Sequence, residues 1–278
     1  MSRYFKKLGI PYLVWLFLLA IVPAIIMVVL SFLDCEGTDF SSASLTLVNF
    51  AQFGYSSTLI AFLNSLLYSS ITTLICAVIG YIVAYAIFRS HFKNKFLILT
   101  LLILPMWSNI LLRVNALKSV MEPHNIIVSL LNKMGINILG PSLAGTPLAI
   151  IIGLIATYLP FMILTIYTAL EKIEYSLEEA ALDLGLTDFK KSWKVVFPLS
   201  FKGIVTGSIM VFLPCMSGFA IPEILGQGNI VLIGNVIDML FRNMNYNVGA
   251  LLSVVILALI IGAIALVNKV DKEGDTLI

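Results

Sequence analysis

Long apolar segments recur along this chain, and they restrict its fold more than any other feature of the sequence. Spanning the hydrocarbon core of a bilayer takes about 20 apolar residues in a helix. Backbone groups cannot stay unpaired in lipid, and the alternation typical of strands is absent, so such segments are predicted to be helices. The sequence therefore predicts an all-α integral membrane protein with six transmembrane helices, at residues 12–33, 59–88, 96–112, 147–170, 203–221 and 248–267.

The composition agrees with this fold class and excludes several kinds of function. Hydrophobic residues make up 60% of the chain and charged residues 12%, with a mean hydropathy of +1.03, whereas soluble domains carry about 25% charged residues. The net charge is +2 and the basic residues are scattered, so no nucleic-acid partner is expected. Cys35, Cys76 and Cys215 have neither paired nor metal-type spacing, which predicts no disulfide framework and no metal site.

The distribution of lysine and arginine indicates how the helices are oriented. The first apolar segment follows Arg3, Lys6 and Lys7, but it is too long for a signal peptide and has no small-x-small cleavage site, so we expect a retained helix. If the N-terminus is cytoplasmic, 13 of the 17 basic residues fall in inner segments and 4 in outer ones. A bias of this size sets the topology, and it predicts that both termini lie in the cytoplasm.

Two long outer segments and three prolines refine this expectation. The outer loops are residues 34–58 and 115–146, and the second contains IIVSLLNKMG, which is expected to form a short interfacial helix. Pro105, Pro160 and Pro214 fall within spanning segments, where each removes a backbone hydrogen bond and kinks its helix. Such kinks are either simply tolerated in membrane helices or belong to helices that line a cavity.

The inner loop at residues 171–202 is charged and helical in pattern. Ser176 followed by Glu179 matches a capping box, and Gly185 is suited to end the helix in the left-handed conformation. A second helix is expected to begin at Thr187 or Asp188 and to run to Pro198, with Lys190, Lys191 and Lys194 on its cationic side. Leu177, Ala180, Ala181 and Leu184 recur at helical spacing, so we expect them on one face of the first helix.

This loop also resembles the EAA loop of bacterial ABC-importer permeases. The family pattern is E-A-A, three residues, G, nine residues, I-x-L-P; the sequence matches it at Glu179, Ala180, Ala181, Gly185 and Pro198. It departs from the pattern only at Val195 and Phe197, which are apolar replacements. The resemblance implies a type I ABC importer permease fold in which this loop couples to an ATPase subunit. It implies an N-terminal helix and external loop at 1–57, a transmembrane domain at 58–268 and a cytoplasmic tail at 269–278.

Three further segments, LLILPMWSNILLRVNALKSV, IIGLIATYLPFMILTIYTALEKI and LIGNVI, are similar to the first permease subunit of spermidine/putrescine importers. This resemblance implies a second permease subunit, two ATPase subunits that hold ATP and Mg²⁺, and a periplasmic or extracellular solute-binding protein, all at the bacterial cell membrane. The chain has no G-x-x-x-x-G-K-[ST] phosphate loop, so we expect no enzyme activity and no cofactor in it. Permeases for ferric iron, sulfate and other solutes share much of the pattern, and six apolar helices alone would also suit a secondary transporter.

A polyamine is a flexible polycation, so its path should offer carboxylates and aromatic faces. Polar and ionisable residues at membrane depth are candidates for such a path. Trp107 can instead belong to an interfacial aromatic belt, and the two acids can be solvated loop residues. The candidate path residues are Trp107, Asn109, Tyr158, Glu223 and Asp238.

Overall fold

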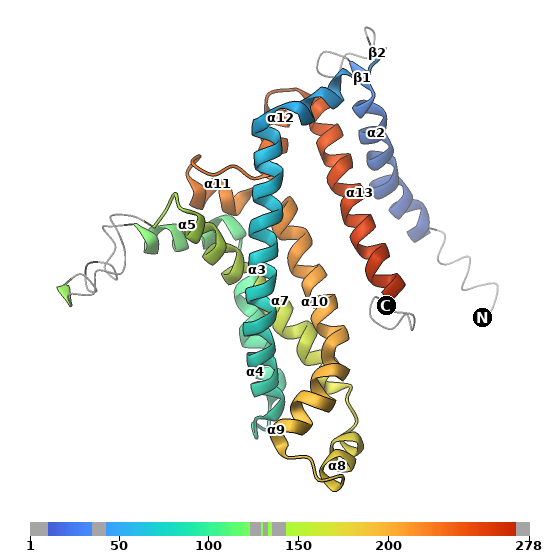
Figure 1. The fold of residues 1–278 in the computed structure, drawn as a ribbon. Helices are drawn as coiled ribbons and strands as arrows, with labels where there is room; N and C mark the ends of the chain where they lie inside the picture. The colour runs from blue at the N-terminus through green and yellow to red at the C-terminus, as the bar shows by residue number, and fades with distance from the viewer. Residues whose placement is uncertain (1–10, 35–42, 123–128, 130–132, 135–142, 271–278) are drawn as a thin grey trace. The chain divides into compact units, whose positions relative to one another are not determined.

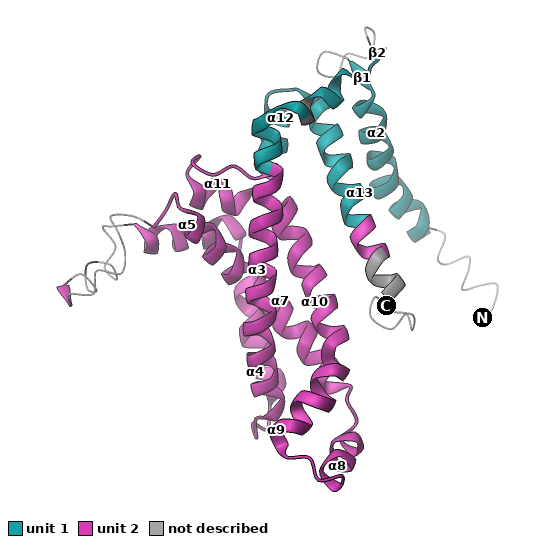
Figure 2. Cartoon of the chain, viewed as in Figure 1, with its two compact units in different colours: residues 1–61, 236–261 teal, residues 62–235, 262–278 magenta. Residues whose placement is uncertain are grey.

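The computed structural model describes residues 11–34, 43–122, 129, 133–134 and 143–270. Helices account for most of this part of the chain (Figure 1). The main helices are α2 (Val22–Ser31), α3 (Ser56–Arg89), α4 (Lys95–Ile103), α5 (Ile110–Met121), α7 (Pro147–Glu171), α8 (Tyr175–Asp183), α9 (Asp188–Lys191), α10 (Phe197–Ser217), α11 (Ala220–Gly226), α12 (Ile233–Arg242) and α13 (Tyr246–Val270). The chain divides into two compact units, one of residues 1–61 and 236–261 and the other of residues 62–235 and 262–278 (Figure 2).

The long helices confirm the predicted membrane spans. Five helices in the described part are long and apolar enough to cross a bilayer, and there are six if a bent pair of helices is counted as one span. The second span is the longest, with 34 residues in α3. The five unbroken candidate spans are Pro11–Ser31, Ser56–Arg89, Pro147–Glu171, Asp188–Ser217 and Tyr246–Ala265.

The third predicted span is not one straight helix. Its two parts, Lys95–Trp107 and Ile110–Met121, meet at an angle of 92°. The first part ends in the 3₁₀ turn η4 (Leu104–Trp107), which contains Pro105. Proline cannot donate the hydrogen bond that would continue the α-helix, so Pro105 lies at a break rather than at a kink inside a continuous helix.

The core of the larger unit is the close pair α7 and α10. Gly203 allows the approach, because a Cβ there would lie 2.4 Å from the Cβ of Ala169 and 3.1 Å from the carbonyl oxygen of Thr165. Helix α11 packs on the preceding turns of α7 in the same way, with Gly153 against Leu225. Small residues at these contacts let backbones come close, as is usual for membrane helices.

The smaller unit contains the N-terminal helix and a short hairpin. In the hairpin, β1 (Leu33–Asp34) pairs antiparallel with β2 (Ser44–Leu45). The 3₁₀ helix η3 (Val48–Gly54) follows, and the side-chain amide of Asn49 donates to the carbonyl oxygens of Ser31 at 3.1 Å and Leu33 at 2.8 Å. The first bond satisfies a carbonyl left open at the end of α2, which begins after the π-helical turn η1 (Phe17–Ile21), and the second ties η3 to β1.

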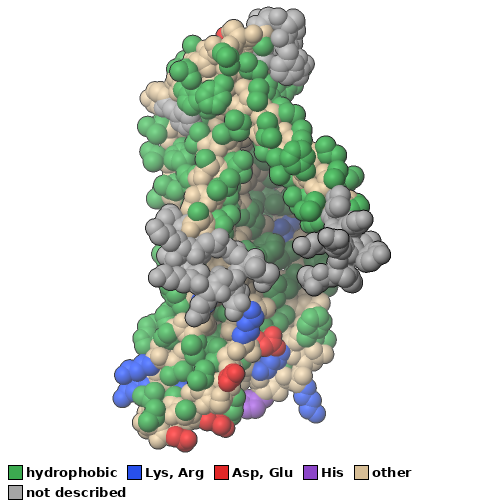
Figure 3. All heavy atoms as spheres, turned by 90° about the vertical axis from the view of Figure 1, so that its right-hand side faces the viewer, with side chains coloured by type: hydrophobic (Ala, Val, Ile, Leu, Met, Phe, Trp, Pro, Cys, Tyr) green, Lys and Arg blue, Asp and Glu red, His purple; other side chains and the backbone are tan. Residues whose placement is uncertain are grey.

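Charged side chains are concentrated at one end of the larger unit. Figure 3 shows most of the visible Lys, Arg, Asp and Glu side chains near the α8 and α9 end, whereas the helices beside them display apolar side chains. A surface of this kind suits helices that lie in hydrocarbon and a charged loop that lies in water. The predicted interfacial helix IIVSLLNKMG falls mostly outside the described residues.

Candidate functional site

Residues 171–202 form two short helices joined at Gly185, as predicted. Gly185 has a φ of +80°, in the left-handed region that favours glycine. The Gly185 amide donates to the carbonyl oxygen of Leu182 at 2.8 Å, and the Leu186 amide donates to that of Ala181 at 3.1 Å. This is a Schellman arrangement, which satisfies the last carbonyls of α8 and fixes the direction in which the chain leaves the helix.

The predicted capping box at the start of this loop is wrong. Helix α8 begins at Tyr175 after Glu174, so Ser176 lies inside the first turn and cannot cap it. Its hydroxyl donates instead to the Glu174 carboxylate at 3.3 Å. The spacing of Ser176 and Glu179 fits the capping pattern by chance, because the helix starts earlier than that pattern requires.

The second helix begins as predicted but does not end where predicted. Thr187 is its N-cap, accepting from the Lys190 amide at 3.4 Å. After α9, the chain makes a π-helical turn, η5 (Ser192–Val196), and continues directly into α10. Pro198 stands in the first turn of α10, where its missing amide hydrogen costs no hydrogen bond. Pro198 therefore does not terminate the helix.

The loop exposes large apolar side chains to its surroundings. Exposed fractions are 84% for Leu184, 79% for Phe189, 68% for Tyr175 and 62% for Trp193. Glu179 and Ala180 are also exposed, whereas Ala181 is buried, so the predicted apolar face of Leu177, Ala180, Ala181 and Leu184 is only partly accessible to a partner. A charged loop with this much exposed apolar surface is typical of a protein-binding site.

A buried ion cluster at the base of the loop was not predicted from the sequence. Glu178, only 2% exposed, accepts a hydrogen bond from Arg89 at the end of α3. Lys191 lies on the other side, with its Nζ 3.5 Å from the same Glu178 oxygen and 3.0 Å from Asp188. Lys191 is therefore a buried partner of a carboxylate, and not part of an exposed cationic side. No local sequence signal relates Arg89 to Glu178, because 89 residues separate them.

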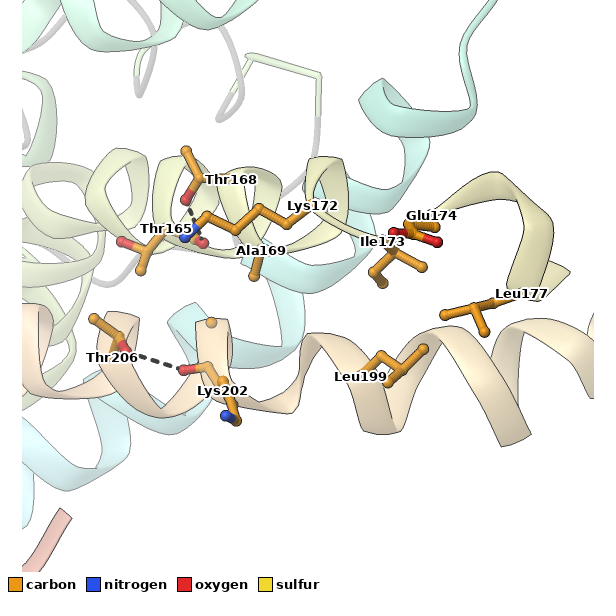
Figure 4. Close-up of a pocket in the computed structure, with 11 residues that line it drawn as sticks. Thr165, Thr168, Ala169, Lys172, Ile173, Glu174, Leu177, Leu199, Lys202 and Thr206 are labelled. Carbon is orange, nitrogen blue, oxygen red and sulfur yellow. Dashed lines mark hydrogen bonds between the residues drawn. The ribbon is translucent and has the colours of Figure 1, made fainter. Parts of the chain in front are cut away.

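A groove of about 400 Å³ lies between the C-terminal end of α7 and the N-terminal part of α10, beside the first turn of α8 (Figure 4). Lys172 and Lys202 lie on its two sides, and Glu174 is at the end next to Leu177. Threonine hydroxyls on both helices face it, but they bond to backbone carbonyls, as Thr168 does to Thr165 at 2.9 Å and Thr206 to Lys202 at 3.0 Å. Two lysines make this groove unfavourable for a cationic solute.

The predicted path residues near the broken third span have different surroundings. Trp107 is 89% exposed. The Asn109 side chain caps α5 by accepting from the Leu111 amide at 2.8 Å, and Arg113 donates to the Pro105 carbonyl oxygen at 2.9 Å. Asn109 and Arg113 thus stabilise the break itself, and Trp107 projects from the turn just before it.

Tyr158 lies in an apolar cavity of about 310 Å³. The cavity is formed by α5, α7 and the turn from α10 to α11, with Leu111, Leu154, Phe219 and Pro222 among its lining residues. Tyr158 brings a phenol hydroxyl to a cavity that is otherwise apolar. This combination of an apolar wall and a few polar groups is usual for small-molecule sites.

The two predicted acids are found in different units. Glu223 is on α11, next to the cavity-lining Pro222, and its carboxylate accepts from the Asn235 amide at 3.1 Å. Asn235 also donates to the Phe219 carbonyl oxygen at 3.0 Å, so it orients Glu223, a role the sequence did not suggest. Asp238 is on helix α12, not in a loop as expected, and forms an ion pair with Arg242 at 2.7 Å.

Comparisons with known proteins agree with this architecture. The family model described as "Binding-protein-dependent transport system inner membrane component" matches residues 77–272. A spermidine/putrescine transport system permease protein, PotB, of Haemophilus influenzae is 35% identical over 92% of this chain and 91% of its own. The PotB protein of Escherichia coli K12 is 33% identical over 91% and 92%.

Solved structures support the same fold. A bacterial ABC transporter involved in the import of the acidic polysaccharide alginate superposes with a TM-score of 0.77, covering 96% of this chain and 95% of the other, at 16% identity. The chain thus has the type I ABC importer permease fold. Because the family model matches well over half of the chain and relatives above 30% identity span most of it, the chain belongs to the family of binding-protein-dependent transport system inner membrane components.

Proposed function

We propose that this chain is a membrane-spanning permease subunit of an ATP-driven importer whose cargo is a polyamine such as spermidine or putrescine. One observation carries the proposal: the similarity to spermidine/putrescine permeases extends over more than nine-tenths of the chain. The cavity that holds Tyr158, next to Glu223, is consistent with this cargo, because methylene groups need apolar walls and ammonium groups need a carboxylate. A secondary transporter does not fit membership of a binding-protein-dependent family.

The loop of α8 and α9 is the proposed docking element for the ATPase. Its exposed Leu184 and Phe189 would enter a groove on that subunit, and the Gly185 turn would hold the two helices at a fixed angle. ATP and Mg²⁺ would bind two ATPase subunits, and a second permease subunit would complete the membrane core. A solute-binding protein would deliver the polyamine on the opposite side.

Transport would proceed by alternating access, in which ATP binding favours one of two conformations of the permease pair. The bias of lysine and arginine supports an orientation with the docking loop and both termini in the cytoplasm. With this orientation, Glu223 and the cavity next to it belong to the outer half of the path. The lysine-lined groove then belongs to the inner end, away from the proposed site of recognition.

Uptake by the full complex in vesicles tests the proposal. The complex is reconstituted with its binding protein, ATP is enclosed, and labelled putrescine, spermidine, ferric iron and sulfate are compared. We expect ATP-dependent uptake of the two polyamines only. Uptake of iron or sulfate in their place would refute the polyamine cargo and leave the importer role intact, whereas ATP-independent uptake would refute the importer role.

A further inference from the structure

Glu178 differs from every other carboxylate in the described part of the chain, because it alone is buried. Its neighbour Glu179 and the nearby Asp183 are exposed on the same helix. A buried charge is costly unless it is paired and hydrogen-bonded. Glu178 meets this requirement with two cations that come from two other elements.

Both cations approach the same oxygen of Glu178. Arg89 donates from the last residue of α3 through Nη2, and Lys191 lies 3.5 Å away at the end of α9. Three helices therefore meet at one atom: the neighbouring α8 and α9, and α3, which is distant from them in the sequence. Lys191 also bonds to Asp188 at 3.0 Å, so it keeps a partner if Glu178 changes.

Arg89 is held rigidly on the side of α3. Its Nε donates to the Tyr85 hydroxyl at 3.2 Å, one turn earlier in the helix. Tyr85 is in turn hydrogen-bonded to Ser192 in the π-helical turn. The guanidinium carbon lies 5.4 Å from the ring centre of Phe88, which adds a cation–π contact. Movement of the Glu178 carboxylate is therefore resisted by α3 itself, and not only by a flexible side chain.

We propose that Arg89 and Glu178 are positioning residues that transmit the movement of α8 to the spanning helix α3. The inference rests on the proposed docking of α8 to an ATPase. When the ATPase pulls α8, separating the pair would remove one of the two cations that compensate the buried Glu178 carboxylate, which is unfavourable. The inner end of α3 therefore follows α8. In this proposal the exposed apolar side chains of the loop bind the ATPase, and the Arg89–Glu178 ion pair transmits the movement of α8 to the spanning helix α3.

The test is a comparison of coupling ratios in the complete reconstituted complex. Variants Glu178→Gln, Arg89→Gln and the double variant are each measured for ATPase co-purification, ATP hydrolysis and polyamine uptake. We expect all three to retain the ATPase and to hydrolyse ATP, while uptake per ATP hydrolysed falls at least about fivefold, the lower end of usual coupling effects. Uptake per ATP hydrolysed should fall no further in the double variant than in either single variant, because each substitution breaks the same Arg89–Glu178 ion pair. Glu122→Gln, which removes an exposed ion pair with Lys118 outside the docking loop, is the matched control and should keep the parent ratio.

The possible outcomes separate this inference from the proposed function. A parent-like ratio in Glu178→Gln or in the double variant overturns the inference. If Glu178→Gln fails to assemble, the double variant decides, because it leaves neither Arg89 nor Glu178 charged. Loss of ATPase binding in the double variant also overturns the inference, since the pair would then shape the docking face. Absence of an ATPase from the parent complex would instead refute the proposed function.

Discussion

At the scale of single residues, Gly185 has the most specific requirement in the loop. Its φ of +80° costs an L-residue with a Cβ about 1–2 kcal/mol, yet no atom lies within 4 Å of where a Cβ would be. Any effect of substitution must therefore come from the backbone and not from a clash. We expect Gly185→Val to redirect α9, and to reduce both ATPase co-purification and solute-stimulated ATP hydrolysis.

Asparagine provides the matched control at this position. It tolerates the left-handed conformation better than other residues with a side chain, so Gly185→Asn should retain most of the ATPase. Both variants should insert in the membrane at parent levels, as measured by quantitative immunoblotting of membrane fractions. Equal ATPase co-purification by Gly185→Val and Gly185→Asn would show that ATPase binding does not depend on the left-handed backbone conformation at this position.

Glu223 can be tested without altering its shape. In Glu223→Gln the side-chain oxygen still accepts from Asn235, so only the charge is lost. We expect slower polyamine uptake at saturating loaded binding protein, with unchanged assembly and basal ATP hydrolysis. Glu122→Gln, which changes an acid paired with Lys118 on α5, is the control and should transport normally. Parent-rate transport by Glu223→Gln would remove this acid from the path.

Trp107 makes a separate prediction through its exposed ring. A cation–π contact contributes roughly 0.5–2 kcal/mol depending on desolvation, which corresponds to about a two- to thirtyfold change in uptake. Trp107→Leu should therefore slow polyamine uptake within this range, whereas Trp107→Phe, which keeps an aromatic face, should be affected less. If the two variants transport equally well at the parent rate, the ring belongs to an interfacial belt.

Residues that act through local backbone conformation were predictable, and residues that act through distant contacts were not. Gly185 and Thr187 follow from helix-end chemistry that involves only four or five neighbouring residues. Ser176 shows the limit of this approach, because a capping pattern cannot tell where the helix begins. Glu178 and Asn235 could not be found at all, since their partners Arg89 and Phe219 are brought to them only by the packing of helices.

At the scale of elements, the pair α7 and α10 depends on Gly203. A side chain there would force the helices apart, since even a Cβ would lie 2.4 Å from that of Ala169. Overpacking of this kind costs about 1–3 kcal/mol. We expect Gly203→Leu to lower the thermal unfolding temperature of the detergent-solubilised protein, measured by tryptophan fluorescence. Gly262→Leu in α13 is the control and should change it little, because no atom lies within 4 Å of the new Cβ position.

The spans themselves were predictable because hydropathy and length decide them. The break in the third span was not, although Pro105 indicates some disturbance of the helix. Whether a proline bends or breaks a helix depends on the groups that satisfy the freed backbone. Here Ser108 and Arg113 both donate to the Pro105 carbonyl oxygen, and Asn109 starts a new helix. Such a set of bonds can be recognised only when the two parts of the span are placed together.

At the scale of the whole molecule, the proposed topology can be tested by cysteine labelling in intact cells. Cys76 and Cys215 are buried and should not react, and Cys35 is replaced by serine. An impermeant maleimide should label Leu45→Cys in the outer hairpin and not Asp183→Cys in the inner loop. Both sites are exposed, so a difference reports the side of the membrane.

Labelling of Asp183→Cys after the cells are opened is the control for its reactivity. Reaction at Asp183→Cys in intact cells, with none at Leu45→Cys, would reverse the proposed orientation. The orientation is predicted from the charge counts in the loops, and this labelling experiment tests it. The contacts with the proposed second permease subunit cannot be predicted in this way, since they would depend on surfaces that only the complex buries.

The π-helical turn before Pro198 has a mechanical consequence. It lets the docking segment and the spanning segment form one continuous helix from Asp188 to Ser217, 30 residues long. At a rise of 1.5 Å per residue, this helix is about 45 Å long. A rotation of about 5° around its midpoint would shift each end by about 2 Å in opposite directions. The N-terminal end of this helix belongs to the proposed docking loop, and its C-terminal end adjoins the cavity of Tyr158. A small tilt of the helix as a rigid body would therefore move the loop and the cavity wall together.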